Sequence, residues 1–280
     1  MKVIDQTLLE KVIIERSRTS HKGDYGRLLL LGGTYLYGGA IIMAALAAVK
    51  SGAGLVTVGT DRENIPALHS HLPEAMAFSL QDQQLLKEQL EKAEVVLLGP
   101  GLRDDTYGEN LVKQVFAGLR QNQILIVDGG ALTILARTSL SFQSNQLILT
   151  PHQKEWEKLS GIAIEKQNKD ATASALTSFP QGMILVEKGP ATRIWQAGQS
   201  DYYQLQVGGP YQATGGMGDT LAGMIAGFAG QFRQASLYER VIVATHLHSA
   251  IAQELSQEHY VVLPTEISNY LPEVMKNVSK

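Results

Sequence analysis

An acidic residue, Asp219, follows a cluster of glycines in the stretch QATGGMGDTLAGMIAGFAG, residues 212–230. The apolar residues after it predict a buried helix, so Gly215, Gly216 and Gly218 lie at the start of that helix. A helix N-terminus offers unpaired N–H groups and the positive end of the helix dipole. Because glycines carry no side chains, these N–H groups can approach an anion, typically a phosphate. A carboxylate beside such an anion hole can take the proton from a hydroxyl group that is being phosphorylated.

The same residues also have a purely structural interpretation. An acid at the start of a helix stabilises it by roughly 0.5–2 kcal/mol when its carboxylate accepts a hydrogen bond from a backbone N–H group. Glycines, for their part, are common wherever the backbone makes a tight turn. The stretch by itself favours phosphoryl transfer. Both interpretations of Asp219 stay open, because one carboxylate can cap a helix and also take a proton.

Six short runs rich in Val, Ile and Leu predict the strands that would position this helix. They cover residues 27–33, 55–61, 95–101, 124–130, 146–152 and 183–189. Helical patterns lie between most of them, at residues 38–50, 82–92, 106–120 and 167–178. Continuous apolar strands that alternate with helices predict an α/β fold with a mostly parallel central sheet and helices on both faces.

The remainder of the chain is expected to complete the same fold. Residues 192–198 and 201–207 predict a β-hairpin, and two long helices are expected near 218–230 and 237–257. No repeat, low-complexity tract or linker interrupts the pattern. We therefore expect one domain, residues 1–280.

Polar residues gather where the predicted strands end. In open α/β sheets, ligands bind beyond the carboxyl ends of the strands. The residues at these ends are Gly32, Gly33, Gly99, Gly101, Asp128, Gly129, Thr150, His152, Lys188 and Gly189. Turns explain the glycines, but they explain less well why an aspartate, a histidine and a lysine share one edge. The sequence therefore predicts a single composite site there.

The composition narrows the class of protein. Of the 280 residues, 44% are hydrophobic and 18% are charged, which is typical of a globular protein with a large core. The formal net charge of −3 provides no basic field, so we expect no nucleic-acid partner. With no cysteine, disulfides, thiolate metal sites and cysteine nucleophiles are excluded. Because no signal peptide or bilayer-spanning stretch is recognisable, we expect a cytoplasmic protein without membrane association.

A second glycine-rich stretch resembles two phosphate-binding motifs but matches neither. LGGTYLYGGA, residues 31–40, lacks the Lys and Ser/Thr of a Walker phosphate loop and the G-x-G-x-x-G spacing of a dinucleotide-binding turn. We interpret Gly39 and Ala40 there as residues that form the floor of a ligand site, with a turn that serves only packing as the alternative.

Four histidines are candidate metal ligands by type but not by spacing. His246 and His248 are two apart on a predicted helix and point to different faces. His69 and His71 lie in a stretch that we interpret as a loop. We expect all four to be core or surface histidines, and we expect no metal site built from the chain's own side chains.

Several segments together resemble a known family. ATGGMGDTLAGMIAG resembles the G-x-G-D signature of the ribokinase-like superfamily of small-molecule kinases. In chain order, HKGDYGRLLLLGG, VVLLGPGL, DGGAL, LTPHQKEWEKLSG and EKGPAT resemble the run seen in ADP/ATP-dependent NAD(P)H-hydrate dehydratases. The similarity covers roughly residues 20–275. Each motif alone is weak, but the ordered set is specific.

The resemblance implies a nicotinamide nucleotide repair enzyme. Such enzymes act on the S-form of NADHX or NADPHX, in which water has added across the 5,6 double bond of the nicotinamide ring. They phosphorylate the ring hydroxyl and expel phosphate, which restores NADH or NADPH. The resemblance also implies ADP, or ATP, as phosphoryl donor, Mg²⁺ bound mainly through phosphates, a homo-oligomer that is often a tetramer, and functional coupling to a separate NAD(P)HX epimerase.

The resemblance assigns roles to particular residues. Asp219 is the base, and the N–H groups of Gly216, Met217 and Gly218 form the anion hole. The expected ADP/AMP-binding residues are Lys188, Gly189, Pro190, Ala191, Thr192 and Gly218. The expected NAD(P)HX-binding residues are Ala40, Gly101, His152 and Asp219. Asp128 and Glu155 are candidate outer-shell groups for the expected Mg²⁺, with the orientation of loops as their alternative role.

The chain departs from the family pattern at three places. Gly130 replaces a residue that is Asp in many relatives, HQKEW replaces His-Pro-Gly-Glu, and GGPYQATGG lacks the usual Gly-Asn.

Two other functions compete with the dehydratase. A kinase of a vitamin-precursor alcohol, of the hydroxyethylthiazole or hydroxymethylpyrimidine type, would share the anion hole. A non-catalytic nucleotide sensor is the third candidate, but a carboxylate at Asp219 would repel phosphate and argues against it. GPGL, LTPHQKE and KGPAT together favour the dehydratase.

Overall fold

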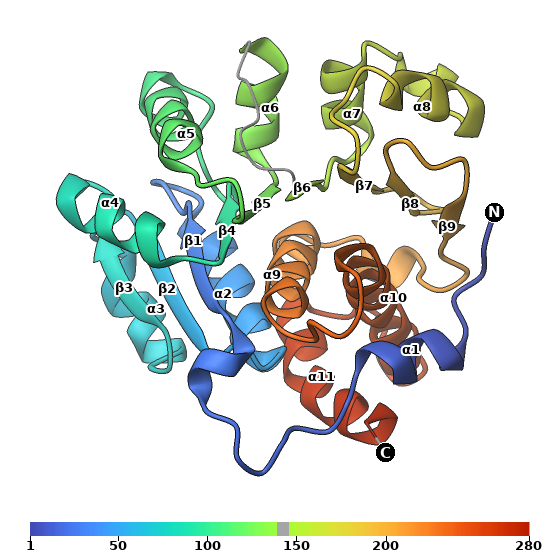
Figure 1. The fold of residues 1–280 in the computed structure, drawn as a ribbon, viewed down its shortest axis with the longest axis horizontal. Coiled ribbons are helices and arrows are strands. Elements are labelled where there is room, and N and C mark those ends of the chain that lie inside the picture. The colour runs from blue at the N-terminus through green and yellow to red at the C-terminus, as the bar shows by residue number, and fades with distance from the viewer. Residues whose placement is uncertain (139–145, 280) are drawn as a thin grey trace.

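A single nine-stranded sheet runs through the computed structural model, which describes residues 1–138 and 146–279 (Figure 1). The strand order is β3-β2-β1-β4-β5-β6-β7-β8-β9. Strands β1 to β7 are parallel, and β8 and β9 are antiparallel. The strands are β1 Arg27–Leu31, β2 Leu55–Thr60, β3 Met76–Ser79, β4 Val95–Leu98, β5 Ile124–Val127, β6 Gln146–Leu149, β7 Ile184–Glu187, β8 Arg193–Gln196 and β9 Tyr202–Gln204.

Helices cover both faces of the sheet. Figure 1 shows α4 to α8 on one face and α2, α9, α10 and α11 on the other. The helices are α1 Gln6–Val12, α2 Gly38–Lys50, α3 Asn64–His71, α4 Gln83–Lys92, α5 Thr106–Gly118, α6 Gly130–Arg137, α7 Gln153–Ser160, α8 Lys169–Leu176, α9 Met217–Gly230, α10 Leu237–Leu255 and α11 Pro264–Val278. Within the described residues, none of these helices has the length and apolar character needed to cross a bilayer.

The side chains of each buried strand alternate between two cores. In β1, Leu28 and Leu30 join the core beneath α2, α9 and α10, whereas Leu29 and Leu31 join the core beneath α4 and α5. This is the period-two geometry of a strand. Because both faces are covered, the parallel strands read as continuous apolar runs in the sequence.

The predicted fold class is confirmed, with additions and one correction. Strand β3 and helices α1, α3, α6 and α7 were not predicted from the sequence, because they have only four to eight residues, and the 15-residue helix α11 was missed as well. His69 and His71 lie on α3, so the loop interpretation was wrong. Each predicted strand also ran one to three residues too far, since its terminal glycine and polar residues belong to the turn at the edge of the sheet.

Helix α9 packs very closely on α2, and glycines make this possible. A side chain at Gly223 would overlap the backbone carbonyl of Ala44, and one at Gly227 would come 2.5 Å from the Ser51 side chain. Near the other end of α9, Gly216 lies against Met43. The contacts advance along both helices in the same direction, so the two N-termini lie at the same edge of the sheet, beyond the carboxyl ends of the strands.

The close approach of the two helices makes a stability prediction. Gly223→Ala is expected to destabilise the fold by about 1–3 kcal/mol through overpacking, although alanine is intrinsically the better helix former. Gly39→Ala in α2 is the matched control, because a methyl group there meets nothing within 4 Å. Urea unfolding measures both. A Gly223→Ala variant as stable as the Gly39→Ala variant would contradict the packing argument.

Candidate active site

Helix α9 begins with an open N-terminus. Its N-cap, Gly216, has a φ of 96°, a left-handed conformation that glycine adopts readily. No side chain caps the helix among the described residues, so the first N–H groups lack the partners that a capping residue would give. A side chain at Gly215 would enter open space. The helix start is therefore accessible to an anion, as the sequence predicted.

Asp219 is the third residue of α9 and is partly buried. Burial raises the pKa of its carboxyl to about 6, and the charge of Asp128 adds to the rise, whereas Lys188 and the backbone N–H of Asp219 oppose it. The carboxylate thus accepts from its own backbone N–H, which is one of the N–H groups of the first turn, and no side chain of the N-cap residue bonds the others. Above pH 6 it is ionised and can accept a proton.

An ion pair joins the ends of two strands beside this helix. Lys188 Nζ donates to Asp128 Oδ1 at 2.9 Å, and the Thr150 hydroxyl donates to the same oxygen at 2.6 Å. The Asp128 side chain is only 3% exposed and that of Lys188 18%. Burial would lower the pKa of Lys188, but Asp128 and Glu155 outweigh this effect and the pKa is raised. The amine is therefore a fixed positive charge.

The ammonium group of Lys188 lies over the first turn of α9. A Cβ atom at Gly218 would come 3.0 Å from Lys188 Nζ. The absence of a side chain at Gly218 therefore lets the cation approach the open N–H groups. The sequence had placed Lys188 with the nucleotide and Gly218 in the anion hole. The structure brings the two together.

His152 and Glu155 form the start of α7. His152 Nδ1 accepts from the backbone N–H groups of Lys154 and Glu155 at 3.1 and 3.3 Å, and Glu155 Oε2 accepts from the His152 N–H at 2.8 Å. This is a reciprocal capping box. Burial raises the pKa of Glu155 to about 7, whereas burial and the charge of Lys188 lower that of His152. Capping occupies Nδ1, so a substrate contact by His152 would use the other ring nitrogen.

Ala40 and Gly101 lie together at the switch point of the sheet, where β1 has β2 on one side and β4 on the other. A Cβ atom at Gly101, whose φ is 65°, would come 3.0 Å from that of Ala40 and would overlap the Tyr37 carbonyl. Ligands of doubly wound sheets bind beside such switch points. Next to them, a side chain at Gly39 would enter open space, which fits the predicted floor for a ligand.

A cavity of about 610 Å³ adjoins the start of α9. This volume is within the range of small-molecule sites. Five of the six predicted nucleotide-binding residues line it: Lys188, Gly189, Pro190, Thr192 and Gly218. The sixth, Ala191, lines a smaller cavity of about 230 Å³ that shares Lys188 and Gly189. The other walls come from residues 205–213, which overlap the GGPYQATGG segment that departs from the family pattern, and from α9 and α10, of which α10 was not predicted to line the site.

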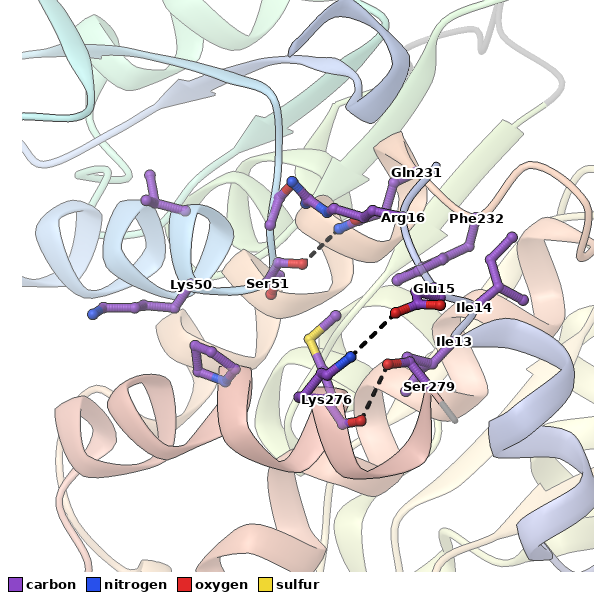
Figure 2. Close-up of a pocket in the computed structure, with 14 residues that line it drawn as sticks. Ile13, Ile14, Glu15, Arg16, Lys50, Ser51, Gln231, Phe232, Lys276 and Ser279 are labelled. Atoms are coloured by element: carbon purple, nitrogen blue, oxygen red, sulfur yellow. Dashed lines mark hydrogen bonds and ion pairs between the residues drawn. The ribbon is translucent and has the colours of Figure 1, made fainter. Parts of the chain in front are cut away.

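A second cavity, of about 500 Å³, lies at the opposite ends of α2 and α9 (Figure 2). Gln231, which lines this cavity, follows Asp219 by 12 residues, so the cavity is about 18 Å from Asp219 along α9. Its polar groups are engaged with one another: Glu15 pairs with Lys276 at 3.3 Å, and Gln231 Nε2 donates to the Ser51 carbonyl at 2.6 Å. Lys50 points away from the other labelled side chains in Figure 2. We therefore interpret this second cavity as a result of how the N-terminal and C-terminal segments pack. It is not part of the candidate active site at the start of α9.

The chain matches characterised relatives over nearly its whole length. A family model for NAD(P)H-hydrate dehydratase matches residues 28–273. A Streptococcus pneumoniae protein named "ADP-dependent (S)-NAD(P)H-hydrate dehydratase" is 90% identical over 276 residues, which cover 99% of this chain and 95% of that protein.

The chain belongs to the NAD(P)H-hydrate dehydratase family.

Solved structures agree with this assignment. A ribokinase-like superfamily protein of Enterococcus faecalis has a TM-score of 0.94 and 41% identity, covering 99% of this chain and 96% of that one. The ADP/ATP-dependent NAD(P)H-hydrate dehydratase of Bacillus subtilis, co-crystallised with ATP/Mg²⁺, has a TM-score of 0.82 and 29% identity, covering 98% and 97%. The predicted ribokinase-like fold and the resemblance to the dehydratases are therefore confirmed. The residue roles carried over from the family stay predictions.

The charges around Asp219 predict how its pKa responds to substitution. Lys188→Met is expected to raise this pKa above 6, because it removes a stabilising cation, and Asp128→Asn is expected to lower it. Carboxyl ¹³C NMR of the nucleotide-free dehydratase, with aspartate labelled and the Asp219 signal assigned from Asp219→Asn, measures all three values. Shifts in the opposite directions would show that the Lys188–Asp128 pair does not control this carboxyl.

Proposed function

We propose that this protein uses ADP to dehydrate the S-form of NADHX and NADPHX, which restores NADH and NADPH. The observation that carries the proposal is that the Lys188 ammonium group lies over the open start of α9. The carboxyl of Asp219, whose pKa is raised, follows the first residue of this helix by two positions. This arrangement combines an anion hole, a fixed cation and a base. The name of the 90% identical Streptococcus pneumoniae protein supports the choice of ADP and of the S-form.

In the first step, the ring hydroxyl oxygen attacks the terminal phosphorus of ADP. The bond from that phosphorus to the bridging oxygen breaks, and AMP leaves with the bonding electrons. The Asp219 carboxylate accepts the hydroxyl proton. Lys188 Nζ and the N–H groups of Gly216, Met217 and Gly218 hold the negative charge of the transferring phosphoryl group. Charge stabilisation by preorganised donors is commonly the largest part of such catalysis.

In the second step, the carbon–oxygen bond of the phosphorylated ring breaks. Phosphate leaves with the electron pair, and the lone pair of the ring nitrogen forms a C=N bond. The neighbouring ring carbon then loses a proton to water, which restores the 5,6 double bond and the lone pair of the nitrogen. The proton held by Asp219 passes to the departing phosphate. Phosphorylation matters because phosphate is a far better leaving group than hydroxide.

The hydrated dinucleotide is proposed to lie along Ala40, Gly101 and His152. This proposal is supported by the close packing of Gly101 on Ala40 at the switch point and by the contact between Met43, three residues after Ala40 in α2, and Gly216 at the start of α9. His152 is at the same edge, at the start of α7, with its side chain 54% exposed. ADP is proposed to occupy the cavity on the other side of Lys188.

Magnesium is proposed to enter with the nucleotide phosphates. Among the described residues, no three His, Asp or Glu side chains gather as a metal cage. Asp128 bonds Lys188 and Thr150. Mg²⁺ commonly keeps several waters and binds through phosphates with few protein ligands, which supports a metal that arrives with the nucleotide. When bound there, it would offset phosphate charge.

Three further proposals concern the setting of the enzyme. We propose a cytoplasmic location, where ADP and nicotinamide nucleotides are used. A separate NAD(P)HX epimerase would complement an enzyme that acts on the S-form alone. We also propose a homo-oligomer, of which a tetramer is one form. It is supported by the exposed side chains of Tyr35, Leu36 and Tyr260, which are 73%, 76% and 101% exposed.

The proposal predicts one decisive activity. The protein incubated with S-NADHX, ADP and Mg²⁺ is expected to restore the absorbance of the reduced nicotinamide and to release AMP and phosphate. A vitamin-precursor kinase would instead phosphorylate hydroxyethylthiazole or hydroxymethylpyrimidine and leave NADHX unchanged. Turnover of such an alcohol without recovery of NADH would overturn the proposal.

The role of Asp219 predicts a large loss on substitution. Asp219→Asn is expected to lower kcat by about 10²–10⁴-fold, the usual contribution of a positioned general base, with ADP binding retained. Asp82→Asn is the matched control, because Asp82 only caps α4, through a hydrogen bond from the Leu85 N–H at 3.0 Å, and asparagine caps equally well. Near-normal turnover by Asp219→Asn would remove Asp219 from the mechanism.

A further inference from the structure

A buried histidine forms part of the wall of the 610 Å³ cavity that adjoins Lys188 and Gly218. His248, on α10, is 5% exposed and lies in this wall between Thr245 and Ser249. From the sequence, we interpreted it as a core or surface histidine. The side chain is buried, which agrees with the core interpretation, and it also lines the cavity.

The Nε2 atom of His248 is buried and has no hydrogen-bond partner within the described part of the chain. Buried polar atoms in folded proteins are nearly always paired with protein or water, so an unpaired ring nitrogen in a cavity wall requires an explanation. Trp156 and Thr220 also have unpaired buried atoms, but neither borders this cavity.

The ring of His248 is neutral at physiological pH. Burial lowers its pKa to about 4, the charge of Lys188 contributes to the lowering, and a backbone hydrogen bond with Met217 opposes it. A backbone group that raises the pKa of an imidazole is a carbonyl that accepts a ring N–H. A neutral imidazole has one N–H and one lone pair. With the N–H directed to Met217, Nε2 carries the lone pair.

The cavity combines this acceptor with two other kinds of surface. Lys188 and the start of α9 suit phosphate, and Pro190, Leu205 and Val207 suit the face of a base. A lone pair does not attract phosphate but does accept from N–H or O–H groups. A nucleoside diphosphate of adenine carries both kinds of donor, in its ribose hydroxyls and its 6-amino group.

We propose that His248 is a specificity-determining residue whose Nε2 accepts a hydrogen bond from the nucleoside part of the bound nucleotide. The donor is a ribose hydroxyl or the adenine 6-amino group. The proposal deepens the proposed function and rests on it only in taking ADP as the nucleotide. It explains why a polar atom is left unpaired in the free protein: the ligand supplies its partner.

Calorimetric binding of ADP analogues tests the proposal. ADP, 2′-deoxy-ADP, 3′-deoxy-ADP and the purine riboside diphosphate, which lacks the 6-amino group, are each titrated into the full-length protein. The analogue that lacks the donor is expected to bind on the order of tenfold more weakly than ADP, the effect of one lost hydrogen bond. The identity of that analogue distinguishes the hydroxyl from the amino group.

Two variants assign the effect to His248. His248→Phe is expected to bind ADP and the affected analogue equally, because the acceptor is gone, whereas His246→Phe, two residues away on α10, keeps the wild-type preference. Equal binding of all four nucleotides by the wild type, or a preference that survives in His248→Phe, would overturn the proposal.

A measurement on the unaltered protein covers the case in which His248→Phe does not fold. With ¹⁵N-labelled histidine, the Nε2 resonance of His248 is expected to move on addition of ADP and to move less with the affected analogue. An unchanged resonance would overturn the proposal. None of these experiments contains NADHX, so a protein that discriminates nucleotides but does not dehydrate NADHX would refute the proposed function alone.

Discussion

The close contact between α2 and α9 is the constraint on which the site depends. Gly223 and Gly227 allow α9 to approach the backbone of α2, and the two helices begin at the same edge of the sheet. This packing fixes the open start of α9 beside the loops that follow β1 and β4. A helix N-terminus binds an anion only if the protein keeps that end accessible, and here the rest of α9 is buried while its first turn is not. The glycines thus have two functions: those inside the helix permit packing, and those at its start leave the N–H groups exposed.

The electrostatics of the site follow from one lysine among three carboxyl groups. Lys188 is attracted by Asp128, Glu155 and Asp219, and its charge is the largest of the effects that oppose the rise in the pKa values of Glu155 and Asp219 that burial causes. The pKa of Asp219 is about 6 in the folded protein and 3.8 for an ordinary aspartate, so the fold favours the protonated carboxyl. The resulting contribution to the free energy of unfolding is complete only below pH 3.8. That contribution is lost as the pH rises through 6. The fold therefore keeps an ionised Asp219 at neutral pH at some cost in stability, which is consistent with a group retained for chemistry.

The sequence was sufficient for the parts of the site that depend on local pattern. The glycine cluster, the acid in the first turn of α9 and the polar ends of the apolar strands all follow from short stretches of chain. The pairing of Lys188 with Asp128 joins residues 60 positions apart, and no local pattern contains it. The same reason applies to His248. Its apolar neighbours in the sequence predict a core histidine on a helix, and only the packing of α10 beside the loop after β7 places it at a cavity. The expectation of one domain and the residue roles taken from the family remain predictions.

The central claim is that the open start of α9 transfers a phosphoryl group to the ring hydroxyl before that oxygen leaves. Isotope tracing tests it most directly. S-NADHX prepared by hydration of NADH in ¹⁸O-labelled water carries the label in its hydroxyl group, and the products formed with ADP are analysed by mass spectrometry. The account predicts that the ¹⁸O appears in inorganic phosphate, because the oxygen leaves attached to phosphorus. Recovery of the label in water, with unlabelled phosphate, would show that the hydroxyl departs without being phosphorylated and would contradict the account.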